Sequence, residues 1–254
     1  MPNGWNVDTQ SPPALIPTRN GLLRSFGLEA REALSPFLKP VHLTSHRLLL
    51  EVGRPVEQVY FPTTALISVI ESVPDRRATE SFLVGPEGAI GLVEVLGSGE
   101  ATQDAIVCVH GEVYAIDSHE FTRITHVMPA VLRVAHLYIQ HLVSTLHQRA
   151  ACITSHSMES RLAAILLRCA GPLGSGDFQL TSFELAQMLG APTAPVATAM
   201  GVMMAKGALA GENERWRLGN LRILQDYACE CHTVEAAAYA QTMSRNRHSI
   251  ANED

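Results

Sequence analysis

The spacing of apolar residues changes several times along the chain, and each change predicts a different kind of element. Residues 22–38 place apolar side chains at helical intervals, which predicts a short helical entry. Between residues 41 and 117 the apolar runs become short and rich in β-branched residues, with turn signals such as "GRP" at 53–55 and "GSG" at 97–99 between them. This rhythm predicts a β-sandwich or jelly roll. Because no helical patterns separate the runs, it argues against a parallel α/β sheet.

From about residue 119 to residue 156 the pattern is helical again and continues for longer. Apolar residues recur there with steps of four and three, as at the a and d positions of a coiled coil. This spacing predicts a long helix over residues 126–156 that forms the seam of a dimer. A core helix packed inside one chain is the alternative that the pattern leaves open. The predicted seam residues are Met128, Leu132, Ala135, Ile139, Leu142 and Leu146.

Residues 181–206 have the pattern of two helices joined by a tight turn. Thr181 and Glu184 have the spacing of a capping box at a helix start, and Gly190 suits the left-handed conformation at its end. A second helix is predicted over residues 192–206, where a proline in the first turn is tolerated because the N–H groups there have no partner within the helix. Such a pair is typical of a helix-turn-helix unit, and an ordinary helical hairpin in a small domain is the alternative.

The segments around this pair complete the predicted unit. A helix is predicted over about residues 158–169, followed by a loop at 171–178. A β-hairpin is predicted from Leu209 onward with its turn at "GN", residues 219–220, and it would make the unit winged. The tail after Asp226 is rich in alanine and then polar, which predicts a short helix and a frayed end.

Composition limits the location and the partners of the protein. Of 254 residues, 46% are apolar and 17% are charged, which is typical of a globular protein with a core. The net charge of −6 means that any surface suited to nucleic acid must be local. No apolar run reaches the roughly 18 residues that cross a bilayer, and the start lacks the pattern of a signal peptide. We therefore expect a cytoplasmic protein with no membrane partner, and the absence of catalytic motifs predicts that it is not an enzyme.

Cysteine usage predicts neither disulfides nor a metal site. The cysteines number five and are scattered, which argues against a disulfide framework. Cys229 and Cys231 form the only close pair, but one intervening residue is shorter than the usual metal-binding spacing, and no second Cys/His pair lies nearby in the sequence. Structural cysteines, with no metal and no cofactor, are the expectation.

The order of these parts resembles the Crp/Fnr family of bacterial transcription regulators along residues 20–228. The most telling segments are "VYFPTTALISVI", "LVGPEGAIGLVEVLG", "ACITSHSMESRLAAILLRCA" and "LTSFELAQMLGAPTAPVATAMGVMMAKGALA", with "ACEC" closing the domain. The resemblance implies an α+β fold with a cyclic-nucleotide-binding-like β-roll (jelly roll), a long dimerisation helix and a C-terminal winged helix-turn-helix. It also implies a homodimer that binds a palindromic DNA operator, responds to a small-molecule effector and contacts RNA polymerase.

The resemblance also sets the expected domain boundaries. A β-roll that senses an effector comes before the long helix, and a DNA-binding domain follows it. The expected parts are a flexible arm at residues 1–19, the β-roll at 20–125, the dimerisation helix at 126–156, the winged helix-turn-helix domain at 157–228 and a tail at 229–254.

The predicted effector site departs from the family's cyclic-nucleotide pattern. Nucleotide-binding members have a Gly-Glu pair and then Arg-Ser, whereas here Leu92 replaces the glutamate and Gln103-Asp104 replaces Arg-Ser. An aspartate repels a phosphate and no guanidinium is present, so cyclic AMP and cyclic GMP are not expected. Another effector and a purely structural roll both stay open, and the iron–sulfur cysteines of the redox-sensing branch are missing. The resemblance places the candidate pocket at Gly91, Leu92, Glu94, Gln103 and Asp104.

The predicted recognition helix lacks the charged residues that the family uses to read bases. Threonine and alanine stand there instead, and threonine offers a single hydrogen bond and a contact to the thymine methyl, which is a weaker code. Basic and acidic residues balance across the winged domain, so non-specific affinity should be modest. A dimeric scaffold whose helix-turn-helix binds another protein is therefore the second hypothesis. The predicted DNA-binding residues are Thr181, Thr193, Ala194, Thr198, Lys206, Arg215 and Arg217.

Overall fold

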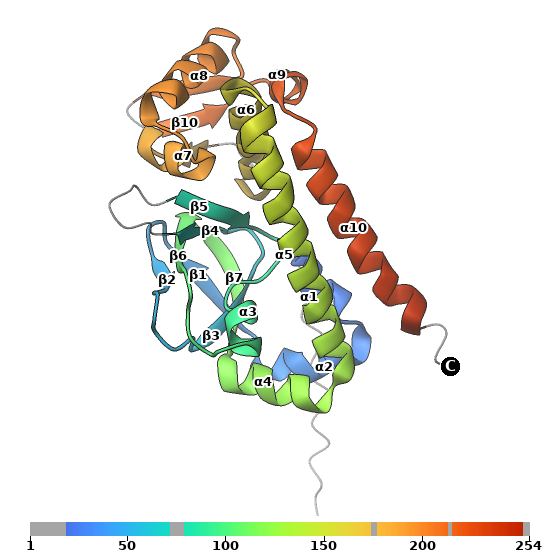
Figure 1. The fold of residues 1–254 in the computed structure, drawn as a ribbon. Helices are drawn as coiled ribbons and strands as arrows, with labels where there is room; N and C mark the ends of the chain where they lie inside the picture. The colour runs from blue at the N-terminus through green and yellow to red at the C-terminus, as the bar shows by residue number, and fades with distance from the viewer. Residues whose placement is uncertain (1–18, 72–78, 174–176, 213–214, 251–254) are drawn as a thin grey trace, which may run out of the picture.

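The protein has an α+β architecture built from three parts (Figure 1). The computed structural model describes residues 19–71, 79–173, 177–212 and 215–250, so the predicted arm lies outside the described residues apart from its last position. A β-domain forms one end of the molecule and a helical unit with a small sheet forms the other. A long helix and the C-terminal helix run side by side along both of them.

Two antiparallel sheets form the β-domain, in the arrangement of a β-roll. One sheet has the order β1-β7-β3 and the other β2-β6-β4-β5. Their facing side chains, among them Leu43, Ile67 and Val107, are fully buried and form the core of the roll. The short β-rich runs of the sequence are thus confirmed as strands. The strands are β1 (Lys39–Leu43), β2 (Leu48–Leu50), β3 (Gln58–Pro62), β4 (Leu66–Glu71), β5 (Thr79–Val84), β6 (Asp104–Val109) and β7 (Gly111–Asp117), and the short helix α3 (Leu92–Leu96) lies between β5 and β6.

Short helices pack around one end of the roll. An aromatic cluster holds them there, because Phe61 of β3 meets Phe26 and Phe121 with ring centroids 6.3 Å and 6.2 Å apart. Asn20 caps the first of these helices and also donates to the carbonyls of Pro62 and Gly88, which ties the helical entry to the roll. The helices are α1 (Gly21–Ser25), α2 (Leu28–Leu34), the 3-10 turn Ser35–Phe37 and α4 (Ser118–Val127).

The predicted long helix is present as α5 (Pro129–Ser155), which has 27 residues. It does not continue from α4, because Met128 between them adopts φ −128° and ψ 89°. Pro129 then starts the new helix, where its missing N–H removes no hydrogen bond. The hydroxyl of Tyr138 donates to the Ala89 carbonyl at 3.2 Å and accepts from the Ala89 N–H at 3.0 Å. This fully buried tyrosine fixes α5 to the turn that follows β5.

The C-terminal unit combines four helices with a three-stranded sheet of order β8-β10-β9. Two predictions are wrong here. Residues 177–179 form an edge strand instead of a loop, and residues 219–220 lie after the hairpin, where Asn220 caps a helix. The hairpin instead joins strands ending at Glu212 and beginning at Arg215. The elements are α6 (Met158–Leu173), β8 (Asp177–Gln179), α7 (Ser182–Leu189), α8 (Thr193–Ala205), β9 (Leu209–Glu212), β10 (Arg215–Leu218) and α9 (Leu221–Tyr227).

The tail forms a long helix, α10 (Cys231–Ile250), so the prediction of a short helix is wrong. It packs along α5, as Figure 1 shows. Met243 is 7% exposed within the cluster that includes Tyr138, and Tyr239 places its ring edge-on to His141 of α5 at 5.1 Å. These contacts stabilise a segment whose own sequence gives a weak helical pattern.

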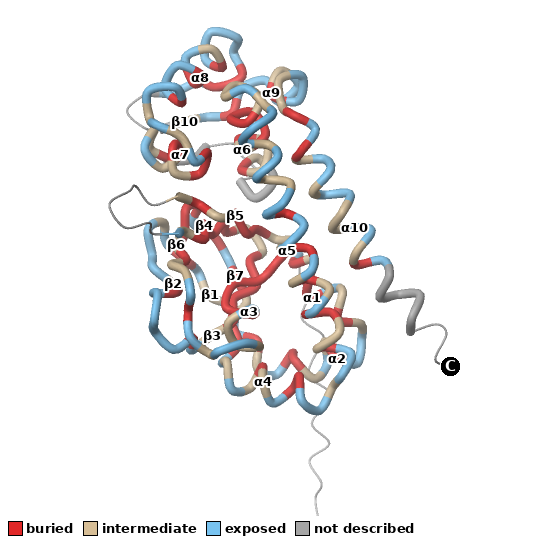
Figure 2. Tube along the Cα trace, in the orientation of Figure 1, coloured by how far each residue is buried: buried red, intermediate tan, exposed pale blue. Residues whose placement is uncertain are grey.

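The winged unit and the roll share one buried cluster. Leu66, Leu83 and Val109 of the roll lie in the same core as Met188 and Leu189 of α7. Figure 2 shows buried segments in β4, in β5 and in α7. No single helix among the described residues is long and apolar enough to span a membrane.

Candidate nucleic-acid interface

Helices α7 and α8 have the geometry of a helix-turn-helix. The predicted capping box is present, since the Thr181 hydroxyl accepts from the Glu184 N–H at 2.9 Å and the Glu184 carboxylate accepts from the Thr181 N–H at 2.7 Å. Gly190 ends α7 with φ 59°, in the left-handed region where a side chain would be strained. The two helices are bent by 107° at the break between them. Local sequence signals therefore set both the ends and the angle of this pair.

Helix α8 turns one face into the core and leaves the other open. Its buried face consists of Val196, Ala199, Met200 and Met203. Thr198 lies on the exposed face, and its hydroxyl donates to the carbonyl of residue 194 in its own helix at 3.1 Å. The exposed residues of α8 are small or uncharged, and they are Ala194, Pro195, Ala197, Thr198, Gly201, Met204 and Ala205.

The predicted phosphate-binding residues lie at the end of α8 and on the wing. Lys206 is exposed directly after α8, and Arg217 is exposed on β10 of the wing. Arg215 begins β10, and its side chain lies outside the described part of the structure. Thr193 is half-buried at the first turn of α8. The wing is held to the helices because the indole N–H of Trp216 donates to the Leu180 carbonyl at 2.7 Å.

Two of the basic residues in this domain point inward, which lowers the positive charge available to DNA. Arg161 is 9% exposed, and its guanidinium donates to the Leu189 carbonyl at the end of α7. Arg168 donates to the Leu83 carbonyl at 2.7 Å and pairs with Glu87 at 3.2 Å. Arg161 therefore joins α6 to α7 within the winged unit, and Arg168 joins that unit to the roll, so both leave recognition to other residues.

The dimer seam predicted on α5 coincides only in part with the side of the helix that is exposed in the structure. Ala135 is fully buried inside its own chain, and the half-buried Leu142 lines the cavity between α5 and α10 that is described below. The reason is that the roll and α10 cover adjoining sides of α5. Leu132, Ile139 and Leu146 of the prediction remain partly or largely exposed, and Met128 is half-buried before the helix begins.

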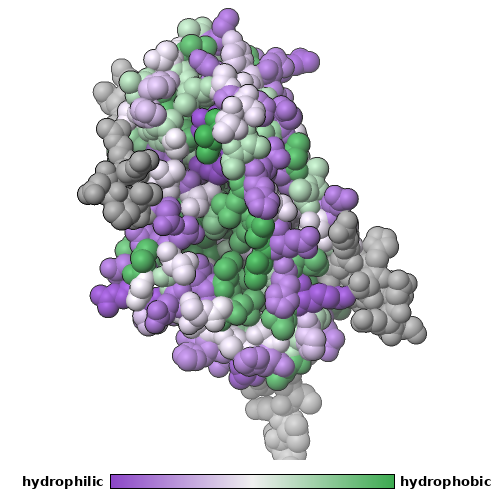
Figure 3. All heavy atoms as spheres, in the orientation of Figure 1, coloured by the Kyte–Doolittle hydropathy of each residue, from purple (hydrophilic) through white to green (hydrophobic). Residues whose placement is uncertain are grey.

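An apolar stripe nevertheless runs along the open side of α5. Val143 is 47% exposed, Leu146 is 39% exposed and Ile153 is 42% exposed. Figure 3 shows a hydrophobic band along the middle of this face of the molecule. The apolar residues on this open side of α5, called the α5 stripe below, are Leu132, Ile139, Val143, Leu146, Ala150 and Ile153.

None of the predicted effector residues lines the cavity between β5, α5, α6 and α10 that is described below. Gly91 starts α3 with φ 84°, and a side chain there would approach the Gln58 carbonyl within 2.7 Å, so the close approach is to the protein's own backbone. Leu92 is fully buried in the core, and burial raises the pKa of the half-buried Glu94. Gln103 donates to the Glu71 carboxylate at 2.8 Å. The carboxylate of Asp104 accepts from the N–H of residue 52 at 2.9 Å.

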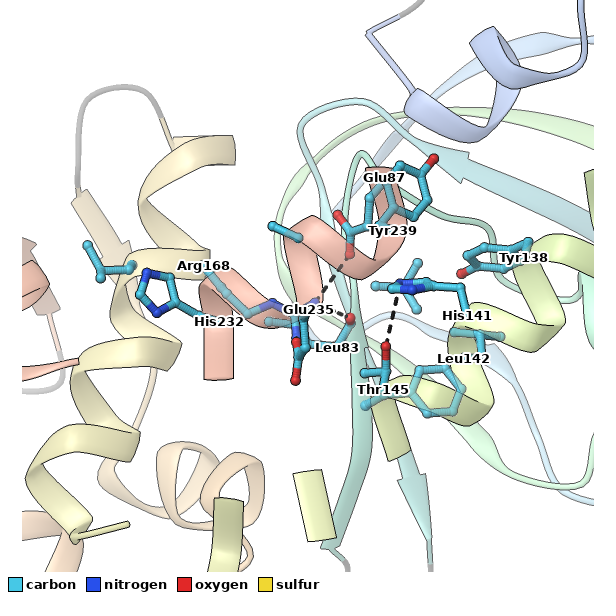
Figure 4. A pocket seen from close by; sticks show the side chains of 14 residues that line it. Leu83, Glu87, Tyr138, His141, Leu142, Thr145, Arg168, His232, Glu235 and Tyr239 are labelled. Carbon is cyan, nitrogen blue, oxygen red and sulfur yellow. Dashed lines mark hydrogen bonds and ion pairs between the residues drawn. The ribbon is translucent and has the colours of Figure 1, made fainter. Parts of the chain in front are cut away.

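A cavity of about 320 Å³ lies elsewhere, between β5, α5, α6 and α10 (Figure 4). Its volume is at the lower end of those that bind small molecules. The sequence analysis missed it because its residues come from distant segments with no shared motif. The side chains labelled in the close view are Leu83, Glu87, Tyr138, His141, Leu142, Thr145, Arg168, His232, Glu235 and Tyr239.

Charged groups at one side of this cavity are paired, whereas one ring nitrogen of His141 is not. Arg168 lies between Glu87 and Glu235; burial alone would lower its pKa, but the two carboxylates outweigh burial and raise it. Burial raises the pKa of Glu235, and Arg168 partly offsets this. Among the described residues, the Nδ1 atom of His141 is buried without a hydrogen-bond partner, whereas its Nε2 atom lies 3.4 Å from the Thr145 hydroxyl. Burial lowers the pKa of His141.

A β-roll joined by a long helix to a winged helix-turn-helix defines the fold class of the Crp/Fnr transcription regulators. FixK2 from Bradyrhizobium japonicum is similar with a TM-score of 0.61 and 16% identity, over 76% of this chain and 98% of that one. A Crp/Fnr-family transcriptional regulator from Eubacterium rectale gives 0.63 and 11%, over 82% and 98%. TTHA1359, a CRP/FNR-family regulator from Thermus thermophilus, gives 0.60 and 19%, over 75% and 98%. The resemblance seen in the sequence is thus confirmed for the fold. No protein-family model and no curated protein matches the chain.

Proposed function

We propose that the protein is a homodimeric DNA-binding transcription regulator of the Crp/Fnr type. The observation that carries this proposal is the bent helix pair α7–α8, whose second helix exposes an open face beside a β-hairpin wing. The fold shared with transcriptional regulators supports it. An effector-sensing roll coupled to a DNA-binding unit is also the arrangement through which a ligand can bias DNA affinity. No enzymatic activity is part of the proposal.

Dimerisation through the α5 stripe would give this regulator its two-fold symmetry. Val143 and Leu146 form the centre of the stripe, and each exposes more than a third of its surface in the single chain. Two parallel copies of α5 would pack these residues as coiled-coil knobs. The paired α8 helices then address a palindromic operator with half-sites about 34–36 Å apart. Contact with RNA polymerase is carried over from the resemblance alone.

Base recognition by α8 would rest on methyl groups and DNA shape more than on charge. Ala194 and Thr198 offer methyl groups that fit the thymine C5-methyl in the major groove. Because the hydroxyl proton of Thr198 is donated within α8, its oxygen remains as an acceptor. Lys206, Arg217 and Arg215 would contact phosphates, so sequence-dependent deformability contributes to specificity.

Selection from a randomised DNA pool at two salt concentrations tests this function directly. We expect enrichment of a palindrome. Arg217→Ala should weaken binding to all sequences alike. It should also reduce the slope of log affinity against log salt concentration by about one. Thr198→Ala should instead alter the preferred sequence. Arg54→Ala removes the same charge from an exposed site on the roll and should leave both unchanged. No binding even at low salt contradicts the proposal.

An effector would act from the cavity beside β5. The positions that correspond to the family's cyclic-nucleotide pattern would not bind it. Arg168 of α6 pairs there with Glu87 after β5 and with Glu235 of α10, so a ligand that displaces either carboxylate would move α6 relative to the roll. The buried Nδ1 atom of His141 offers a hydrogen bond to a small ligand that is otherwise apolar. Two carboxylates at the cavity do not favour a cyclic nucleotide phosphate.

The neutral state of His141 predicts how stability changes with pH. Because burial lowers its pKa, the unfolded chain binds a proton near pH 6.5 that the folded protein resists. The contribution of neutral His141 to the free energy of unfolding is therefore full above about pH 6.5 and is lost as pH falls toward the folded pKa. Between about pH 7.5 and 5.5, the free energy of unfolding measured with denaturant should fall less for His141→Gln than for the wild type. His119→Gln, at an exposed site, should keep the wild-type loss. Equal losses in the wild type and H141Q contradict the prediction.

A dimeric scaffold that binds protein through α8 is the second candidate function. The observation that favours it is the uncharged outer face of α8, where Met204 is 40% exposed. Methionine side chains adapt to irregular protein partners. The DNA selection separates the two functions, because the scaffold predicts no enriched sequence at either salt concentration.

A further inference from the structure

Four metal-binding side chains meet at the corner where α5 gives way to α6. Cys152 lies in the last turn of α5, and His156 is the residue that ends it. Cys229 follows α9, and Cys231 begins α10. The three sulfur atoms and a ring nitrogen all lie within 4.8 Å of one another. The sequence predicts no metal site because no second Cys/His pair lies near Cys229 and Cys231 along the chain. In the structure, Cys152 contacts Cys229 although 77 residues separate them in the sequence.

Two distances in this cluster match the edges of a tetrahedron around one metal ion. Zinc binds thiolate at about 2.3 Å and imidazole at about 2.1 Å, which puts two sulfurs roughly 3.8 Å apart and a sulfur and a nitrogen about 3.5 Å apart. The Cys152 and Cys229 sulfurs are 3.6 Å apart, and the Cys231 sulfur lies 3.4 Å from Nδ1 of His156. An iron–sulfur cluster, with several irons and bridging sulfides between its ligands, would spread the four side chains further apart.

We propose that Cys152, His156, Cys229 and Cys231 bind a single zinc-class divalent cation in a closed tetrahedral site. Three thiolates and one imidazole are a ligand set that selects zinc over magnesium, calcium or manganese. With four protein ligands the ion has no open position, so the site is structural and supplies no catalytic water.

The surroundings of the four ligands support this assignment. Nε2 of His156 lies 3.5 Å from the Glu230 carboxylate, which orients the ring so that Nδ1 faces the cluster. The side-chain amide of Gln148 donates to the Cys231 sulfur at 3.1 Å. Arg161 lies near enough to Cys152 and Cys229 to interact with their charge, and it would offset the single negative charge left by three thiolates on a divalent ion.

A metal here would join three segments of the fold that lie in different parts of the sequence. Cys152 and His156 belong to the helix that carries the α5 stripe, whereas Cys229 ends the winged unit and Cys231 starts α10. Cys229 also donates its backbone N–H to the Ser160 carbonyl of α6 at 3.4 Å. The bound ion would therefore hold the angle between α5 and α6 and dock α10 against α5.

Metal analysis of the full-length protein, purified and reduced, tests the proposal. We expect one zinc per chain after supply of zinc and removal of excess. Replacement by cobalt should give the intense visible absorption of tetrahedral coordination together with thiolate-to-metal charge-transfer bands. These spectra are measured on the wild type, so the test does not depend on the folding of any variant. A reduced wild type that binds no zinc, or cobalt spectra without thiolate bands, overturns the proposal.

Matched variants then identify the ligands. Cys231→Ser and His156→Gln should each lower zinc affinity at least 100-fold, and Glu230→Ala should lower it about 10-fold to 100-fold through the orientation of His156. Cys169→Ala removes a fully buried thiol away from the cluster and should retain one zinc per chain. Equal zinc content in C231S, H156Q and wild type overturns the assignment. DNA binding is not needed for either measurement, so failure of the site is distinguishable from failure of the proposed function.

Discussion

Val143→Glu should convert the proposed dimer into monomers at micromolar concentration. Val143 lies at the centre of the α5 stripe and is 47% exposed in the single chain. In a dimer built on this stripe, two carboxylates would be buried against each other, at a cost of several kcal/mol per ion. Because each 1.4 kcal/mol changes an equilibrium tenfold, the dissociation constant should rise by about a thousandfold or more. Sedimentation equilibrium measures the change.

The control for this prediction is Val52→Glu. Val52 is 52% exposed on the roll, away from α5, and its replacement should leave the dimer intact. DNA affinity should fall with V143E, since a monomer addresses one half-site only. A wild type that sediments as a monomer, or a V143E variant that remains dimeric, shows that the stripe is not the interface.

Arg149→Met should lower the free energy of unfolding by about 3–5 kcal/mol, because it leaves a buried carboxylate without its partner. Glu80 of β5 is 1% exposed in its side chain, accepts from the Ser68 hydroxyl at 2.6 Å and pairs with Arg149 at 3.1 Å. The same guanidinium donates to the Met188 carbonyl at the end of α7. One side chain of α5 therefore joins the roll to the winged unit.

A double variant separates this effect from a loss of packing. Glu80→Gln in the Arg149→Met background should recover most of the lost stability, since a neutral amide can stay buried with Ser68 as its partner. Arg123→Met breaks an exposed pair with Glu120 and should cost less than about 1 kcal/mol. If E80Q does not rescue R149M in denaturant unfolding, the buried charge is not the cause.

The features that the sequence predicts well are those set within a few residues. The capping box of Thr181 and Glu184 and the left-handed Gly190 depend only on neighbouring backbone, and both are present. Short runs rich in β-branched residues and divided by turn signals likewise predict strands of the roll without knowledge of their partners. Such signals define where helices and strands begin and end, and through them the fold class.

Features that depend on distant packing were missed or misplaced. The seam on α5 has a helical period that fits several rotations of the helix, and only the positions of the roll and α10 decide that Ala135 is buried and Val143 is open. The tail has little amphipathic signal of its own, so its length depends on contact with α5. Cys152 and Cys229 meet across 77 residues, which no spacing rule for contiguous motifs detects.

The core shared between the roll and the winged unit also has a consequence for cooperativity. Leu66 and Leu83 of one unit are buried with Leu189 of the other, so neither unit can unfold without exposing apolar surface of its neighbour to water. The two units should therefore melt in a single thermal transition, and limited proteolysis should not release a stable roll from a stable winged fragment.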